Sequence, residues 1–172
     1  MKVEYLLNRE VEHVLAALTP SNRLALRVSL HTGLRVGDVL ALRRAQLAPQ
    51  FWITEQKTGK RRRVGLPAEL LRDLRSEAGE LWVFEGRNDW RKHRTRQAVW
   101  ADVKRAQRAF RLPQNIGPHS FRKVYAVDLM QRYGDIERVR RALNHRDVSV
   151  TMIYAMADQL LRAKNKKIRN RA

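Results

Sequence analysis

The chain contains no cysteine, no long apolar run and comparatively few acidic residues. The lack of cysteine excludes disulfides, thiolate nucleophiles and cysteine-based zinc sites. Residues 1–7 form a short stretch of mixed polarity, and no stretch reaches the roughly 20 apolar residues of a membrane span. These absences argue against a signal peptide or a transmembrane helix and favour a reducing compartment.

The scarcity of acidic residues leaves a strong excess of positive charge. The chain has 36 Lys+Arg against 17 Asp+Glu, a formal net charge of +19. Such an excess favours a polyanionic partner, since each phosphate that is neutralised releases condensed counterions. Ribosomal and histone-like proteins share this bias, so charge alone does not separate these classes. The 172 residues are 44% hydrophobic, which fits one globular domain rather than a disordered basic tail.

Hydrophobic periodicity predicts a mainly α domain with a small three-stranded antiparallel sheet, an α+β fold. Asn8 and Ser21 are expected to cap the first two helices, and Gly33 to end the second. Thr95 and Asp135 are expected to cap later helices. Helices are predicted over residues 36–42, 68–77, 95–111, 119–132 and 136–143, with a last one from about residue 148.

Two β-rich segments, residues 51–55 and 62–66, flank the turn sequence Lys57-Thr58-Gly59-Lys60. They predict a hairpin in which Gly59 supplies a positive φ. Residues 81–84 are predicted as the third strand. Residues 162–172 form a basic tail, which is expected to fray.

Chemically reactive residues recur in short, ordered motifs. These are Thr32-Gly33-Leu34-Arg35, the hairpin turn with Lys57, His119-Ser120-Phe121-Arg122, Leu143-Asn144-His145 and Tyr154. A tyrosine is a weak nucleophile, because a phenol pKa of about 10 leaves roughly one molecule in a thousand ionised at neutral pH. Cationic donors at the non-bridging oxygens of a phosphodiester would stabilise its attack, and losing one such donor costs about 10²–10³ in rate.

The spacing of these residues suits phosphate chemistry. His119 and Arg122 lie three apart, so on a helix they project from the same face. The start of that helix also offers unpaired N–H groups to a phosphate. Lys57 at a hairpin tip can reach into a groove, and a lysine with a lowered pKa can protonate a leaving oxygen.

The order of the motifs resembles the tyrosine recombinase (phage integrase) family. The segment from Thr32 to Leu42 is similar to the family's first arginine box, with Asp38 in its acidic place. Lys57-Thr58-Gly59-Lys60 resembles the hairpin lysine segment, and His119-Ser120-Phe121-Arg122 the His-x-x-Arg box. The segment from Leu143 to Tyr154 resembles the second histidine and the nucleophile. The resemblance covers about residues 6–160.

The resemblance implies a role for each matched residue. Tyr154 would form a 3′-phosphotyrosyl link and release a 5′-hydroxyl, while Arg35 and Arg122 clamp the scissile phosphate. Lys57 would protonate the leaving oxygen, His119 would act in proton transfer at the tyrosine, and His145 would hydrogen-bond the phosphate. The covalent link conserves the bond energy for religation, so the resemblance implies no metal or nucleotide cofactor.

The implied partner is double-stranded DNA. Further phosphate contacts are expected from exposed cations, each steepening the salt dependence by about 0.9. These candidates are Arg43, Lys60, Arg61, Arg63, Arg91, Lys92, Arg94 and Arg96. Because strand alternation separates Arg62 from Arg61 and Arg63, at least one hairpin face is expected to meet the DNA backbone.

The resemblance also bears on assembly, domain organisation and location. The segment after the nucleophile, residues 155–161, would dock on a neighbouring subunit and build a homo-tetramer on DNA. The chain is expected to be a single catalytic domain lacking the family's N-terminal core-binding domain, either as a fragment or as a minimal member. Its expected location is the cytoplasm, at the nucleoid, with a bacterial, phage or mobile-element origin.

Other functions remain open at the level of sequence. One is a non-catalytic or regulatory DNA-binding relative, and another is a type IB topoisomerase or telomere resolvase using the same residues. A basic ribosome-associated protein explains the charge but not the order of the motifs. Tyr125 and Tyr133 compete with Tyr154 as nucleophile, though neither follows a histidine at the family spacing.

Overall fold

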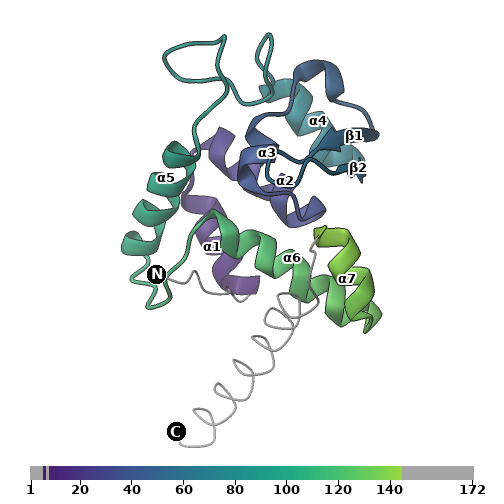
Figure 1. The fold of residues 1–172 in the computed structure, drawn as a ribbon. Coiled ribbons are helices and arrows are strands. Elements are labelled where there is room, and N and C mark those ends of the chain that lie inside the picture. Colours follow the sequence, from purple (N-terminus) through teal and green to yellow (C-terminus); the bar gives the residue numbers. More distant parts are fainter. Residues whose placement is uncertain (1–5, 7, 145–172) are drawn as a thin grey trace, which may run out of the picture.

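The computed structural model describes residue 6 and residues 8–144, and Figure 1 shows how their helices and strands are arranged. The predicted last helix, the basic tail, His145 and Tyr154 lie outside the described residues. The elements are α1 (Asn8–Ala17), α2 (Pro20–Thr32), α3 (Val36–Leu40), the 3₁₀ helix η1 (Arg44–Gln46), β1 (Gln50–Thr54), β2 (Arg61–Gly65), α4 (Ala68–Glu77), α5 (Arg96–Ala109), α6 (Pro118–Tyr133) and α7 (Ile136–Leu143).

The first two helices follow the apolar pattern of their sequence. Val11, Val14, Leu15 and Leu18 are all buried, as their helical spacing predicts. The expected cap at Ser21 is wrong, because α2 begins at Pro20 with Thr19 as its N-cap. Proline is pre-shaped for the first helical position, so the helix starts one residue before Ser21.

The sheet has two strands in the described residues rather than the predicted three. β1 and β2 pair antiparallel with Trp52 opposite Arg63, each displaced by one residue from its predicted bounds. Residues 81–84 instead make one isolated bridge, between Trp82 and Arg43. Phe84 and Val83 fill the core, at 2% and 1% exposure, and the backbone of their segment bonds to residues 42–44, which turn at once into η1. Because residues 42–44 run directly into this helix, they are too short to form a ladder of backbone hydrogen bonds with residues 81–84.

The caps of the later helices follow the sequence closely. The Thr95 hydroxyl accepts a hydrogen bond from the Ala98 N–H, and the Asp135 carboxylate accepts from two N–H groups at the start of α7. Gly134 ends α6 in the left-handed conformation. These caps depend on local chemistry, which explains why they could be predicted.

One large core joins α1 to α6 and the hairpin, and a small cluster of Ala126, Val139 and Leu143 packs α7 on α6. In Figure 1, α5 lies at one side and the hairpin with α4 at the other, with α2 and α3 between them. None of the helices in the described part of the chain is long and apolar enough to cross a membrane.

Candidate active site

Arg35 sits in a tight junction between α2 and α3. Gly33 ends α2 with φ of +66°, and Arg35 follows as the extended N-cap of α3. A Cβ at Gly33 would lie 2.5 Å from two ring carbons of Tyr125 on α6. The Ser29 hydroxyl also donates to the Leu34 carbonyl, at 2.7 Å. Backbone geometry and packing therefore both fix the point from which the Arg35 side chain leaves.

Lys57 lies in the turn between β1 and β2, and its side chain is exposed. Gly59 has φ of +65°, as predicted, and its N–H donates to the Glu55 carbonyl at 2.8 Å. The Asp38 carboxylate on α3 accepts from the Gln56 N–H at 2.9 Å. Burial is the largest influence on Asp38 and raises its pKa, although the bond from Gln56 opposes this. The arginine box therefore holds the turn that carries the lysine.

Arg122 is buried on α6, at 2% exposure. Its Nη1 donates to the Gly33 carbonyl at 2.6 Å, and its Nη2 donates to the Leu143 carbonyl at 2.5 Å. Both carbonyls belong to helix C-termini, which carry partial negative charge and favour cations. Arg122 thus joins the end of α2, which leads to Arg35, to the end of α7, which leads to His145.

Arg62 makes the same connection from β2. It donates to the carbonyls of Thr32, at 2.7 Å, and Ala142. Its side chain points inward, whereas Arg61 and Arg63 are exposed, so the predicted alternation of the three arginines is confirmed. Burial lowers the pKa of Arg62, and the nearby Glu55 carboxylate opposes that effect.

His119 lies in the first turn of α6 and is exposed. Partial burial and four nearby cations lower its pKa to about 4; the cations are Arg122, Arg35, Lys123 and Lys57 in order of effect. The imidazole is therefore neutral at pH 7. Arg122 lies one turn further along α6 and bonds to the Gly33 carbonyl, two residues before Arg35.

The segment before His145 can be followed as far as Asn144. Asn144 ends α7 with φ of +54°, a left-handed conformation that asparagine tolerates. Its side-chain amide lies 3.5 Å from the Thr58 hydroxyl in the lysine turn. The last described residue before His145 thus contacts the turn that carries Lys57.

The rival nucleophile Tyr125 is poorly suited to attack. Its ring packs against Gly33, and burial raises its pKa, which leaves less phenolate than in water. Tyr133 is 47% exposed at the far end of α6, with the Arg138 guanidinium 3.4 Å from its ring centroid.

The DNA-contact candidates fall into groups. Exposed cations surround the hairpin and η1: Lys60, Arg61, Arg63 and Arg43, with Arg61 and Arg43 stacked over Trp52 and Trp82. Arg91 and Lys92 are exposed and pair with Asp89. The Arg96 Cδ would lie 3.3 Å from a Cβ at Gly37, which places it beside the arginine box.

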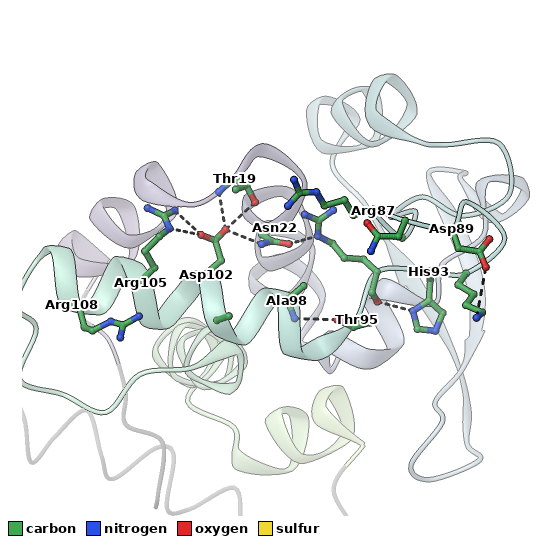
Figure 2. A pocket seen from close by; sticks show the side chains of 15 residues that line it. Thr19, Asn22, Arg87, Asp89, His93, Thr95, Ala98, Asp102, Arg105 and Arg108 are labelled. Atoms are coloured by element: carbon green, nitrogen blue, oxygen red, sulfur yellow. Dashed lines mark hydrogen bonds and ion pairs between the residues drawn. The ribbon is translucent and has the colours of Figure 1, made fainter.

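Arg94 differs from the other candidates because it turns toward the protein. Its Nε donates to the buried Asn22 amide oxygen at 2.6 Å, and Asn22 donates to Asp102 at 2.8 Å. Figure 2 shows this network at an open pocket of about 780 Å³ between α5 and residues 86–95. Arg35, Lys57, His119 and Arg122 do not line that pocket, so it is separate from the candidate site.

Sequence reasoning missed two buried groups, Glu55 and Arg62. Glu55 is fully buried and lies 2.5 Å from Arg35 and 3.4 Å from Arg62. A signal was present, because alternation placed Arg62 on the same hairpin face as the apolar Phe51 and Ile53. A buried arginine needs an anionic partner, and Glu55 at the end of β1 is the nearest acid in the hairpin sequence.

Comparisons with known proteins identify the family of this chain. The model of the "Phage integrase family" matches residues 4–160. The protein named "Probable integrase/recombinase YoeC" of Bacillus subtilis is 30% identical over 139 residues, covering 76% of this chain and 74% of that protein. A "Tyrosine recombinase" of Thermosipho africanus is 27% identical over 168 residues, covering 91% of this chain and 58% of that protein.

The fold agrees as well. The catalytic domain of bacteriophage HP1 integrase superposes with a TM-score of 0.66 at 24% identity, covering 91% of this chain and 89% of that chain. The chain spans about half the length of other curated relatives, 49% and 43% in two of them. With a family match over residues 4–160 and a relative at 30% identity, the chain belongs to the phage integrase family.

Proposed function

We propose that this chain cleaves and rejoins DNA at specific sites, with Tyr154 as nucleophile. The observation that carries the proposal is a set of contacts: Arg122 bonds to the Gly33 carbonyl, two residues before Arg35, and Glu55 joins Arg35 to Thr58, the neighbour of Lys57. These residues come from the α2–α3 junction, the hairpin turn and α6, which lie far apart in the sequence. Three cations beside one proton acceptor suit the attack of a phenol on a phosphodiester.

The proposed chemistry assigns one task to each group. The Tyr154 oxygen attacks the phosphorus, the bond to the 5′-oxygen breaks, and the 3′-phosphate stays on the tyrosine. Arg35 and Arg122 stabilise the charge that develops on the non-bridging oxygens. In the family resemblance, His145 adds a hydrogen bond to the same phosphate.

Proton transfer is divided between His119 and Lys57. A neutral imidazole can accept the phenol proton, whereas a charged one cannot. Lys57, an ammonium on an exposed turn, gives a proton to the departing 5′-oxygen. Religation reverses these transfers, and the phosphotyrosyl bond supplies the energy, so the proposal includes no cofactor.

We further propose that the chain acts as the catalytic domain of a recombinase on bacterial, phage or mobile-element DNA at the nucleoid. The exposed arginines and lysines of the hairpin, η1, residues 91–92 and the start of α5 support binding to the duplex. A homo-tetramer joined through residues 155–161 is part of the proposal. A solved lambda integrase structure, at TM-score 0.74 and 17% identity, is a tetramer bound to a Holliday junction.

The test is a covalent-capture assay. The protein is incubated with a pool of nicked duplexes of randomised sequence, denatured, and assayed for DNA that stays attached. Wild-type protein should retain a set of related sequences, and Tyr154→Phe should retain none. Retention without sequence preference, together with relaxation of supercoiled plasmid, would favour a topoisomerase. An adduct that persists in Tyr154→Phe would overturn the assignment of the nucleophile.

A further inference from the structure

Glu55 is the fully buried carboxylate between two arginines. Its Oε2 accepts from the Arg35 Nη1 at 2.5 Å and from the Thr58 hydroxyl at 3.2 Å. Its Oε1 lies 3.4 Å from the Arg62 Nε. The Glu55 backbone is held too, because its N–H donates to the Lys60 carbonyl at 3.0 Å. Both the side chain and the main chain of Glu55 are therefore fixed.

Arg62 holds the Glu55 carboxylate in a fixed position. Its two terminal nitrogens donate to the carbonyls of Thr32 and Ala142, at the ends of α2 and α7. The Arg62 side chain is only 16% exposed, and the Glu55 side chain is 0% exposed. A charge buried this deeply must keep its partners, because removing one leaves an uncompensated ion.

Arg35, unlike Arg62, belongs to the proposed phosphate-binding group. Its side chain is 19% exposed, and it leaves the α2–α3 junction two residues after Gly33, whose carbonyl accepts from Arg122. An arginine carries five N–H donors in a planar fork, so a carboxylate at Nη1 sets the plane in which the other donors point. Without that partner, the long side chain would sample several rotamers.

We propose that Glu55 is a positioning residue for the cleavage reaction. Arg62 holds the Glu55 carboxylate in place, and the carboxylate in turn orients the Arg35 guanidinium. The inference rests on the proposed function. The same carboxylate receives the Thr58 hydroxyl, so it also ties the turn that carries Lys57 to Arg35. Glu55 thereby fixes the position of the phosphate-binding Arg35 relative to Lys57, the proposed general acid.

Glutamine at position 55 removes the negative charge of the side chain and keeps its size and shape. A carboxylate offers one oxygen to each arginine, whereas an amide has a single oxygen and an NH₂ group. In Glu55→Gln, one arginine would therefore face a donor. Arg62 stays held by two carbonyls, so Arg35 is the side chain that moves. A displacement of about 1 Å in such a site can cost about 10²-fold in rate.

The experiment measures single-turnover cleavage of a suicide duplex at saturating protein. Glu55→Gln is expected to lower the cleavage rate by about 10²-fold while DNA affinity stays close to that of the wild type. Glu69→Gln is the matched control, since it removes the carboxylate of an ion pair whose glutamate is 71% exposed. That control should cleave at the wild-type rate.

A double-mutant cycle tests whether Glu55 acts through Arg35. In an Arg35→Lys background, Glu55→Gln should cost little more, because the fork that it orients is already gone. Equal slowing in both backgrounds would overturn the proposal, as would unchanged cleavage by Glu55→Gln alone. If Glu55→Gln does not fold, Thr58→Val removes the hydroxyl contact to Oε2, together with the longer contacts to the Lys60 N–H and the Asn144 amide. This variant should give a smaller slowing with the same dependence on Arg35.

Guanidinium rescue gives a readout that a purely structural role would not change. Guanidinium ion added to Arg35→Ala should restore part of the cleavage, because Glu55 can hold the ion in place of the side chain. Glu55→Gln combined with Arg35→Ala should lose that rescue, and rescue of equal size in both proteins would contradict the proposal. A wild-type protein that forms no covalent adduct would refute the proposed function itself rather than the role of Glu55.

Discussion

Gly33 and Gly134 offer a matched comparison of what the Arg35 junction requires. Both end helices in the left-handed conformation, with φ of +66° and +64°. A Cβ at Gly33 would lie 2.5 Å from the Tyr125 ring, whereas a Cβ at Gly134 would meet nothing within 4 Å. Alanine at either position carries the same backbone strain, but only alanine at Gly33 also collides with a ring.

The magnitudes follow from these contacts. Left-handed geometry costs an alanine about 1–2 kcal/mol, which is the expected loss for Gly134→Ala. Carbon atoms pack at about 3.5–4.0 Å, so a contact at 2.5 Å forces the ring or α6 to move. Overpacking of this kind costs about 1–3 kcal/mol more, giving roughly 2–5 kcal/mol for Gly33→Ala. Such a loss is a large share of a typical stability of about 5–15 kcal/mol.

The assay is urea unfolding of both variants, followed by circular dichroism and tryptophan fluorescence. Gly33→Ala should lose about 1–3 kcal/mol more than Gly134→Ala. In a Tyr125→Ala background, Gly33→Ala should cost only about as much as Gly134→Ala, because the space then exists. Equal losses in the two single variants would refute the claim that the Tyr125 ring fixes this junction.

Three further predictions concern protons, buried polar groups and salt. The folded-state pKa of His119 is lowered, to about 4, so the unfolded chain binds its proton first as pH falls from 6.5 toward 4. The free energy of unfolding should therefore fall over that pH window in the wild type, and it should fall less in His119→Gln. An equal dependence on pH in the two proteins would contradict this. Burial alone would raise the pKa of Asp102, but hydrogen bonds from Asn22 and other donors lower it overall. Asp102→Ala should therefore lose about 3 kcal/mol by urea unfolding at pH 7, and a loss under about 1 kcal/mol would count against the network. Finally, Arg61→Gln should reduce the salt slope of DNA binding by about 0.9, whereas Arg94→Gln should leave the slope unchanged and lower stability; the reverse pattern would show that the exposed arginine is not the DNA contact.

Local chemistry explains which parts of the fold could be predicted from sequence. The caps at Thr95, Asp135 and Gly134 depend on side chains and backbone angles within one turn of the helix. The hairpin with Gly59 is equally local. Residues 81–84 look like a strand because they are apolar, but their pairing depends on how the chain turns at residues 42–44. That information is tertiary, so the third strand was wrong.

The candidate site shows the same division. The residues Arg35, Lys57, His119 and Arg122 could be proposed from the sequence because they occur in the order of the family's motifs. The carbonyls that hold Arg122 and Arg62 could not, since they belong to helix ends brought together only by folding. Glu55 was missed for a related reason, because its contact with Arg35, which lies 20 residues earlier in the sequence, forms only on folding. The hydrogen bond from Arg94 to Asn22 is a further contact that no local pattern signals.

The most direct test of the central claim is to identify the amino acid that becomes attached to DNA. Covalent complexes from the suicide-duplex reaction would be digested with protease and nuclease, and the nucleotide-bearing peptide sequenced by mass spectrometry. The account predicts a 3′-phosphate on Tyr154 and free 5′-hydroxyl ends on the released strand. A nucleotide on Tyr125 or Tyr133, or a 5′-phosphate link, would contradict it.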